Sequence, residues 1–534
     1  MSSKAKAAKA PKVLISDELS PEAIEIFKKK GVEVDFKPGL KPEEQMKIIA
    51  EYDGLAIRSA TKVTADMIKA ASNLKVVGRA GIGVDNVDIP KATEAGVIVM
   101  NTPFGNSITT AEHAIAMMFA VARDIPQANA STHAGKWEKS KFMGVELFNK
   151  TLGLVGCGNI GSIVADRAIG LKMNVIAFDP FLTKERAVEI GVEKVELEEI
   201  WKRADFITLH VPKNDSTKNM INKDSIAKMK DGVRIINCAR GGLIVEADLK
   251  DALDSGKVGG AALDVFDVEP AKENVLFGNP KLICTPHLGA STNEAQFNVA
   301  IQVAEQMADY LMTGAITNAL NMPSISAEDA PRLKYYMKLA EQLGSFAGQI
   351  TEHAINKIDI EFEGSVTELN VKPLTQMLVA SLLRPQTESV NMVNAMAIAK
   401  SRGIQISESR VEVASDQRTK ITVNVETEAR KRSISGTLFT GREPRIVNIE
   451  GVPVEVALTQ NMLFIRNEDK PGLIGALGTL LGDAGMNIAD FRLGRKEDTG
   501  EAVCLVSLDS AISDAVFEKV SALPQVKTAK RLSF

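Results

Sequence analysis

Three glycines at the spacing G-x-G-x-x-G separate an apolar run from a run with helical periodicity. They are Gly156, Gly158 and Gly161 in the segment LGLVGCGNIG. TLGLV, before them, has the pattern of a buried strand, and SIVADRAIGLKM, after them, has that of a helix. At such a junction the first glycine permits a tight turn, the second lets the backbone approach a pyrophosphate, and the third lets helix and strand pack closely, with the helix N-terminus facing the anion. The segment therefore predicts a dinucleotide-binding turn.

An acidic residue ends the next predicted strand, NVIAFD. Asp179 lies eighteen residues beyond Gly161, where a carboxylate accepts hydrogen bonds from the adenosine ribose and repels a 2′-phosphate. We therefore expect NAD rather than NADP. The alternative is a glycine-rich turn in an α/β fold that binds no nucleotide, which the strand, helix and acid around the turn disfavour.

Three short segments further along carry the residue types that hydride transfer requires. INCARGG contains Arg240, LDVFDVEP contains Asp264 and Glu269, and CTPHLGAS contains His287. Oxidation of an alcohol needs a base with a pKa near the working pH, which an imidazole supplies. A carboxylate bonded to its other nitrogen would fix the tautomer and raise the imidazole pKa, and Glu269 is the candidate. Arg240 could hold a substrate carboxylate in a bidentate pair.

Two arginines in the first part of the chain could bind further negative charge. Arg58 ends the strand GLAIRS and Arg79 ends the strand in LKVVGRAG. The ends of parallel strands deliver ligand-binding residues to one crevice. Taken singly, each arginine could equally be a solvated cation. Glu269 could be a surface acid, and His287 could be a histidine at a strand end. His113, His133, His210 and His353 are expected to be structural, and none of the histidines has the spacing of a metal ligand.

Composition and charge exclude several function classes. Of 534 residues, Lys and Arg total 64 against 68 Asp and Glu, a formal net charge of −4. We therefore expect no nucleic-acid partner and no anionic membrane surface. Four cysteines without a C-x-x-C pair predict a cytoplasmic protein without structural zinc. No window reaches the roughly 20 apolar residues of a membrane helix.

The pattern of strands and helices predicts two Rossmann-like α/β units with parallel sheets, followed by α+β modules. A long helix, opened by a capping box at Ser107 or Thr109 with Glu112, enters the second unit, and another leaves it over 290–314. We therefore expect a discontinuous first domain, 10–104 and 292–320, with a domain at 105–291 inserted into it. Residues 321–457 form a third module, and 458–534 show the β-α-β-β-α-β order of a ferredoxin-like fold.

Taken together, the motifs identify a family. VGRAGIGVDNVD, VMNTPFGNS, GKWEKSKFMG, VGCGNIG, INCARGG, ALDVFDVEP and CTPHLGAST are similar to segments of the D-isomer-specific 2-hydroxyacid dehydrogenases, and the resemblance covers residues 12–320. It implies a catalytic trio and a set of NAD contacts, with Asp264 at the nicotinamide carboxamide. The trio is Arg240, Glu269 and His287; the cofactor contacts are the three glycines, Asn159, Ile160, Asp179 and Asp264, with Cys238 counted among them.

The resemblance also implies a substrate. It places Arg58, Arg79 and Asn101 around a phosphorylated acid, and Lys139 at the phosphate site of a neighbouring subunit. The implied activity is NAD-dependent oxidation of 3-phosphoglycerate to 3-phosphohydroxypyruvate, the entry to L-serine synthesis, by a homo-oligomer. Two alternatives stay open: another D-2-hydroxy acid such as glycerate, lactate or 2-hydroxyglutarate, and a NAD-sensing binding protein of the same fold.

The C-terminal segment resembles an ACT domain, a regulatory module that binds small ligands. The resemblance implies that Asn467, Asp469 and Asn487 recognise L-serine as an effector. A purely structural dimerisation unit is the alternative. The third module resembles the intervening domain of the longest members of the same family.

Overall fold

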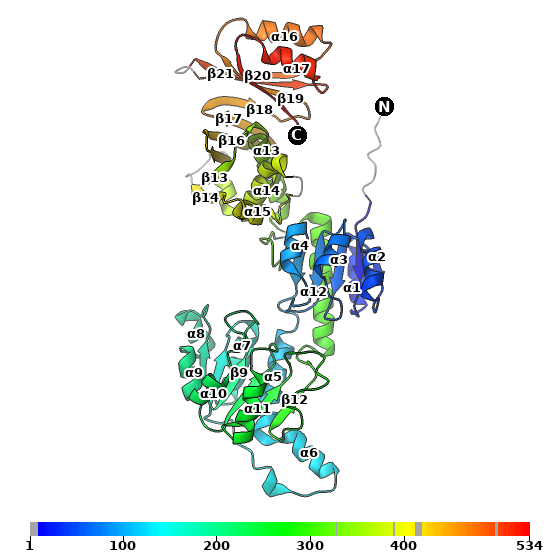
Figure 1. Ribbon diagram of the computed structural model, residues 1–534, viewed down its shortest axis with the longest axis vertical. Helices are drawn as coiled ribbons and strands as arrows, with labels where there is room; N and C mark the ends of the chain where they lie inside the picture. Colours follow the sequence, from blue (N-terminus) through cyan, green and yellow to red (C-terminus); the bar gives the residue numbers. More distant parts are fainter. Residues whose placement is uncertain (1–8, 327, 388–389, 412–418, 497–499) are drawn as a thin grey trace.

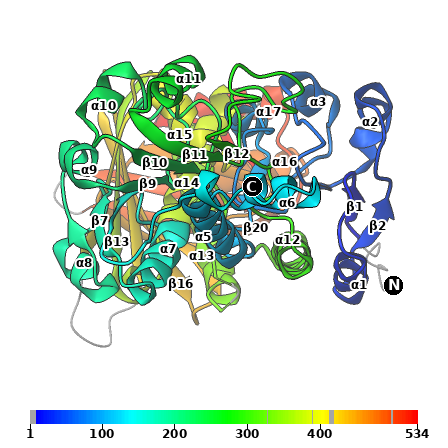
Figure 2. The ribbon, with the colours of Figure 1, turned by 90° about the horizontal axis from the view of Figure 1, so that it is seen from below.

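The computed structural model describes residues 9–326, 328–387, 390–411, 419–496 and 500–534, and within these residues the strands form four sheets. Figure 1 shows the four sheet units in a row, with the unit of α7–α11 at one end, the unit of α1–α4 next, and the unit of α16 and α17 at the other end. In the view from below, α1, α2, β1 and β2 lie to one side of the other elements (Figure 2). None of the described helices is long and apolar enough to cross a membrane.

The first sheet has the strand order β2-β1-β3-β4-β5, and all its pairings are parallel. One face packs on α1 and α12, and the other packs on α2, α3 and α4. The elements are β1 (Lys12–Ile15), α1 (Glu22–Lys29), β2 (Glu33–Phe36), α2 (Pro42–Ile48), η1 (Ile49–Glu51), β3 (Gly54–Ile57), α3 (Ala65–Ala70), β4 (Val76–Arg79), α4 (Ile89–Ala95) and β5 (Ile98–Asn101).

The first unit is completed by a helix from much later in the chain, α12 (Asn293–Thr313). Its residues Val303 and Met307 are fully buried against β3 and β4. A Cβ at Gly78 in β4 would lie 2.2 Å from Met307 Sδ and 2.7 Å from Val303 Cγ2. Glycine is therefore needed there for α12 to approach the sheet.

The second sheet has the order β12-β11-β10-β9-β6-β7-β8, also entirely parallel. Helices α5, α7 and α8 cover one face, and α9, α10 and α11 cover the other. The elements are α5 (Ser107–Arg123), α6 (Ile125–His133), η2 (Lys139–Lys141), β6 (Thr151–Val155), α7 (Asn159–Gly170), β7 (Asn174–Phe178), α8 (Lys184–Ile190), β8 (Glu193–Lys194), α9 (Leu197–Arg203), β9 (Phe206–Leu209), α10 (Lys223–Lys228), β10 (Val233–Asn237), α11 (Glu246–Ser255), β11 (Val258–Leu263) and β12 (Leu282–Cys284).

The chain crosses between the first two units twice, between β5 and α5 and between β12 and α12. The capping box predicted for α5 is wrong. The helix begins after Asn106, which makes no side-chain cap, and Ser107 Oγ instead donates to Pro103 O at 3.0 Å. In the segment between β5 and α5, the Ser107 hydroxyl is used in this local hydrogen bond and not in a capping box.

The third sheet is mixed and has the order β14-β13-β15-β16-β17-β18. Helices α13 and α14 pack on it. The elements are α13 (Ala330–Ile350), β13 (Ile355–Glu363), η3 (Gly364–Glu368), α14 (Lys372–Leu383), η4 (Arg384–Gln386), α15 (Ala395–Ser401), β14 (Gln405–Val411), β15 (Lys420–Thr427), β16 (Lys431–Phe439), β17 (Glu443–Ile449) and β18 (Val452–Val456).

The fourth sheet is antiparallel with the order β20-β21-β19-β22. Helices α16 and α17 cover one face, and Phe464 on the other face packs edge-on against Phe346 of α13, with ring centroids 5.6 Å apart. The elements are β19 (Met462–Glu468), α16 (Leu473–Asp483), β20 (Ile488–Lys496), β21 (Glu501–Leu508), α17 (Asp514–Ser521) and β22 (Val526–Leu532). The predicted fold class, including the ferredoxin-like order of the last unit, is confirmed.

Candidate active site

Two neighbouring cavities lie between the first and second units. The larger holds about 670 Å³ and the smaller about 400 Å³. Both are lined by Arg79, Asn106, His287 and Ala290, so these residues stand where the cavities meet. Arg58 lines only the larger cavity, and the glycine turn lines only the smaller one. The cavities thus place one anion-binding and one nucleotide-binding candidate on either side of His287.

The glycine turn follows β6, where the strand order of the second sheet reverses, which is the usual ligand position of such sheets. Gly156 has φ of 93°, in the left-handed region. A Cβ at Gly161 would lie 2.1 Å from Gly156 O, whereas a Cβ at Gly158 would meet nothing within 4 Å. The turn is therefore closed behind Gly161 and open at Gly158, which fits a bound pyrophosphate.

The residues around the turn are arranged for a dinucleotide. Asn159 and Ile160 begin α7 and line the smaller cavity. Asp179 Oδ2 accepts a bond of 2.8 Å from Cys157 N, so the carboxylate lies beside the turn. Cys238 directly follows β10 and lines the same cavity; burial raises the pKa of its thiol, which stays protonated. These positions fit NAD.

His287 and Glu269 form an ion-pairing dyad. His287 Nδ1 lies 2.7 Å from Glu269 Oε2, and Glu269 Oε1 accepts from Phe266 N at 3.0 Å. The bond to Glu269 raises the pKa of His287 above its ordinary value of 6.5, although burial and Arg240 oppose this. Burial opposes ionisation of Glu269, but the bonds from His287 and Phe266 outweigh it and lower the pKa of the carboxyl. With Nδ1 bound, Nε2 is the nitrogen that can accept a substrate proton.

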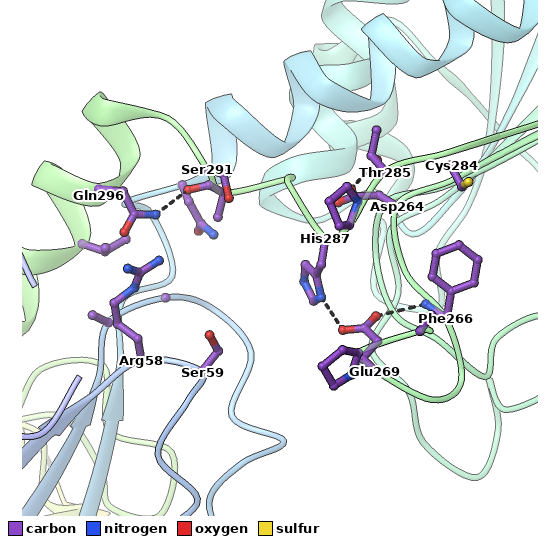
Figure 3. Close-up of a pocket in the computed structure, with 18 of the residues that line it drawn as sticks. Arg58, Ser59, Asp264, Phe266, Glu269, Cys284, Thr285, His287, Ser291 and Gln296 are labelled. Carbon is purple, nitrogen blue, oxygen red and sulfur yellow. Dashed lines mark hydrogen bonds and ion pairs between the residues drawn. The ribbon is translucent and has the colours of Figure 1, made fainter. Parts of the chain in front are cut away.

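The backbone at His287 is unusual, with φ of 57°. A non-glycine residue in this region is strained and is kept there only when its surroundings hold it. Figure 3 shows the imidazole between Arg58 and Ser59 of the first unit and Glu269 and Phe266 of the second.

Arg240 reaches from the second unit to the first. Its Nε donates to Asp85 Oδ2 at 2.9 Å, and its Nη1 donates to Ala239 O at 2.7 Å. The side chain is 28% exposed and lies against Gly83. Because Asp85 is 69% exposed, this pair is weak, and a substrate carboxylate can compete for the guanidinium.

Arg58 and Arg79 form no ion pair among the described residues. Burial, and then repulsion from Arg240 and Arg58, lower the pKa of Arg79 to about 10. Its buried Nε has no hydrogen-bond partner. Arg58 is held through its backbone, because Asp17 Oδ2 accepts from Arg58 N at 2.7 Å. A pair of unneutralised guanidinium groups in one cavity is suited to an anion such as phosphate.

Three predicted site residues lie elsewhere or have other partners. Asn101 donates to Ile82 O at 2.7 Å and lines neither cavity. Lys139 begins η2, is exposed, and lies outside both cavities. Asp264 lines the larger cavity but has no exposed surface. His113, read as structural, lies 3.3 Å from Asp264 through its Nε2.

Of the three predicted effector residues, Asn467 lies in β19, Asp469 directly follows that strand, and Asn487 directly precedes β20. Asn467 is 3% exposed, and its Oδ1 has no hydrogen-bond partner. Asp469 Oδ2 accepts from Arg495 at 2.7 and 2.8 Å. Asn487 donates to Asp509 Oδ2 at 2.7 Å. Of the three, Asn467 is the one with a buried polar atom that has no partner, whereas Asp469 and Asn487 each have a side-chain partner in the ligand-free protein.

Sequence reasoning missed two residues that line the cavities. Asn106 is 8% exposed, and its Oδ1 faces no partner at the junction of the two cavities. Asp85 pairs with Arg240 from the other unit. Asp85 lies inside the motif VGRAGIGVDNVD, but a linear pattern does not show that it contacts Arg240. Within the described residues no group of three His, Cys, Asp or Glu is arranged to hold a metal ion.

Comparison with known proteins is consistent along the whole chain. Three family models match: the NAD-binding domain of D-isomer specific 2-hydroxyacid dehydrogenases over 115–289, the D-3-phosphoglycerate dehydrogenase intervening domain over 332–450, and the ACT domain over 461–525. A D-3-phosphoglycerate dehydrogenase of Synechocystis is 43% identical and covers 97% of this chain and 94% of its own. The one from Bacillus subtilis is 42% identical, over 97% and 99%.

One similar solved structure is that of a relative with its cofactor bound. The NAD⁺-bound 3-phosphoglycerate dehydrogenase of Entamoeba histolytica matches 59% of this chain and 99% of its own, with 29% identity and a TM-score of 0.50. The three family models and the relatives that match nearly end to end agree on one family. The chain therefore belongs to the D-3-phosphoglycerate dehydrogenase family, within the D-isomer specific 2-hydroxyacid dehydrogenases.

Proposed function

We propose that this protein oxidises 3-phospho-D-glycerate at C2 to 3-phosphohydroxypyruvate with NAD⁺, the first step of L-serine biosynthesis. The observation that carries the proposal is the position of the His287–Glu269 dyad. It stands where a cavity with two unneutralised arginines meets a cavity lined by the glycine turn.

Each charged group of the substrate has a matching group in the cleft. The phosphate binds between Arg58 and Arg79, and Arg240 exchanges its exposed bond to Asp85 for the substrate carboxylate. This fixes C2 beside His287, whose Nε2 takes the hydroxyl proton while Glu269 stabilises the imidazolium that forms. NAD⁺, when bound, accepts the hydride from C2. It would be held by the glycine turn, Asn159, Ile160, Asp179 and Cys238.

The assembly and regulation are also part of the proposal. We assign 10–104 with 292–320 to substrate binding, 105–291 to NAD binding, 321–457 to the intervening domain and 458–534 to the ACT domain. Asn101 holds the segment after β4, which follows Arg79, through its bond to Ile82 O. Lys139, exposed and outside the cavities of its own chain, reaches the phosphate site of a second subunit in a homo-oligomer. The four cysteines are free thiols, which supports a reducing compartment such as the cytoplasm.

The direct test is NADH formation by the pure protein with 3-phosphoglycerate, D-glycerate, D-lactate and D-2-hydroxyglutarate at saturating NAD⁺. We expect the phosphorylated acid to give the highest kcat/KM. Arg58→Ala should lower kcat/KM for 3-phosphoglycerate about 10-fold or more and leave that for D-glycerate within a few-fold, since a charge-assisted bond contributes about 1.5–3 kcal/mol. Arg167→Ala, in an exposed pair on α7, is the control. Equal losses on both substrates would remove the phosphate assignment.

L-Serine is the proposed effector of the ACT domain. A serine titration of the initial rate should show inhibition, and Asn467→Ala should weaken it because Asn467 Oδ1 is the buried acceptor without a partner. L-Threonine is the matched ligand control. Serine inhibition that is identical in Asn467→Ala and the parent would exclude this residue from the effector site.

A further inference from the structure

A third cavity, here called the joint cavity, lies where the first and third units meet. It holds about 260 Å³ and shares no described lining residue with the two cavities around His287. Its walls are the start of β5, the end of α12, the first turns of α13 and the segment before α15. Beside it, Asn394 Nδ2 of the third unit donates to Glu94 O of α4 at 2.8 Å (Figure 1). The joint cavity is therefore built from both units.

The chain between α12 and α13 forms one wall of the joint cavity. Ile316 and Ile325 pair through their backbones, each N–H donating to the carbonyl of the other at 2.8 Å. Their side chains and that of Met322 are buried and line the cavity. Backbone hydrogen bonds thus hold this wall in place in the ligand-free protein.

Most of the lining is aliphatic and adaptable. Voids in a close-packed protein interior are seldom larger than a water molecule, so a space of this size is unusual. At roughly 30 Å³ for each water-sized group, the joint cavity holds about eight or nine such groups. Methionine side chains adjust to the shape of a ligand. The apolar lining residues are Ile98, Ile316, Met322, Ile325, Ala330, Leu333, Met337, Met392 and Val393.

Two lining side chains carry hydrogen-bond donors that no described residue uses. The Tyr310 hydroxyl forms no hydrogen bond with the part of the chain that the structure describes, and burial raises its pKa, so it keeps its proton. Lys334 of α13 is exposed and forms no ion pair with a described residue. The other hydroxyl of the lining, that of Thr313, already donates to Asp309 O at 2.6 Å. No Asp or Glu is among the described lining residues, so the lining offers donors and a positive charge to a ligand.

We propose that the joint cavity binds an aliphatic carboxylate of about eight carbons, a size taken from its volume. The hydrocarbon chain lies among the isoleucine, leucine and methionine side chains, and the carboxylate accepts from Tyr310 and pairs with Lys334. An amine is excluded as the head group, because the described lining holds no carboxylate to pair with it. A bound carboxylate contacts both units and so ties the third unit to the first.

Isothermal titration calorimetry of the full chain with a series of carboxylates tests the size and charge of the ligand. The Kd should fall about fourfold for each methylene from butanoate to octanoate, the gain typical of a buried methylene. It should stop falling beyond decanoate, because the cavity is then full. Octylamine should bind about 10-fold or more weakly than octanoate, because it loses the charge-assisted bond. Affinity that keeps rising through dodecanoate, or equal binding of octylamine, would mean adsorption to apolar surface and would overturn the proposal.

Two variants test the groups assigned to the carboxylate. Tyr310→Phe should raise the octanoate Kd about 10-fold or more, the loss typical of a hydrogen bond to a charged group. Lys334→Gln should raise it about 2–5-fold, because an exposed ion pair contributes less. Tyr335→Phe and Lys338→Gln, on α13 but outside the cavity lining, are the matched controls and should leave the Kd unchanged. A parental Kd in Tyr310→Phe would overturn the proposal.

Filling the joint cavity tests the place of the hydrocarbon chain. Ala330 begins α13, is 8% exposed and lines the cavity, so Ala330→Phe should occupy the space and raise the octanoate Kd about 10-fold or more. Should this variant fail to fold, Ala330→Leu, which adds a smaller side chain, gives the same test. A parental Kd in a folded filling variant would place octanoate elsewhere and overturn the proposal.

The arginine pair of the cleft also attracts carboxylates, so Arg58→Ala separates the two sites. Arg58 lines the larger cavity of the cleft and not the joint cavity, and the octanoate Kd should therefore match that of the parent. Loss of octanoate binding in Arg58→Ala would assign the ligand to the cleft and overturn the joint site. All titrations omit NAD⁺ and 3-phosphoglycerate, so their outcome does not depend on the proposed function.

Discussion

Arg79 should lower the stability of the ligand-free protein, although it binds the substrate. Burial and the neighbouring Arg240 and Arg58 lower its pKa from 12.5 to about 10. At about 1.4 kcal/mol for each tenfold change in acidity, this corresponds to a cost on the order of 3 kcal/mol for the charged form. Its orphaned Nε agrees with this cost. We therefore expect Arg79→Met, which keeps the volume and removes the charge, to stabilise the ligand-free protein.

The sign of this effect does not depend on pH in the accessible range. A cation whose pKa is lowered by folding destabilises the native state fully below its folded pKa, and the cost disappears only as the pH rises toward 12.5. The gain in Arg79→Met should therefore be equal at pH 6 and pH 8. In thermal unfolding, each kcal/mol corresponds to about 2–4 °C for a unit of 150–250 residues, so a rise of several degrees is expected.

Arg79→Met should also bind 3-phosphoglycerate more weakly. Removing the buried partner of an anion costs about 2–5 kcal/mol, a factor of roughly 30 to several thousand in kcat/KM for 3-phosphoglycerate. Added 3-phosphoglycerate should raise the Tm of the parent but not of Arg79→Met. Arg167→Met, at an exposed pair, should change neither quantity. A ligand-free Arg79→Met that unfolds below the parent, or that the substrate stabilises equally, would refute the reasoning.

Three further predictions concern the dyad, the turn and the cleft. Glu269→Gln removes the charge that raises the pKa of His287, so the acidic limb of kcat/KM against pH should move to lower pH; an unmoved limb would exclude the dyad. Gly161→Ala would place a Cβ 2.1 Å from a backbone carbonyl, so its NADH Kd, by fluorescence titration, should rise at least 10-fold, while Gly170→Ala on the same helix should bind normally. Asp85→Asn removes the competing carboxylate at Arg240, so KM for 3-phosphoglycerate should fall, and a raised KM would mean that Asp85 orients Arg240 for the substrate.

The sequence predicted the elements whose signals are local. The glycine turn, Asp179 and the arginines at strand ends each follow an apolar run, and parallel strands bring such ends together whatever the loops between them do. The return of α12 to the first sheet was predicted from two tandem α/β units, the second entered by one long helix and left by another. Gly78 beneath Met307 shows the close contact that makes this return possible, which no linear pattern contains.

The sequence could not predict partners that depend on the meeting of distant segments. His113 looked structural because it lies on an apolar helix face, yet its Nε2 lies 3.3 Å from Asp264, which directly follows β11. The family resemblance assigns Asp264 to the nicotinamide, which stays a prediction, and no linear pattern shows that its carboxylate also accepts from Leu288 and Gly289. Asn101 and Lys139 stay predictions, because their assigned contacts depend on a substrate and a second subunit.

The most direct test is a crystal structure of the inactive His287→Asn protein with NAD⁺ and 3-phospho-D-glycerate. We expect the C2 oxygen at about 2.6–3.2 Å from the side chain at position 287, the phosphate on Arg58 and Arg79, and the carboxylate on Arg240. A substrate whose C2 hydroxyl turns away from that side chain, or whose phosphate binds outside the arginine pair, would contradict the account.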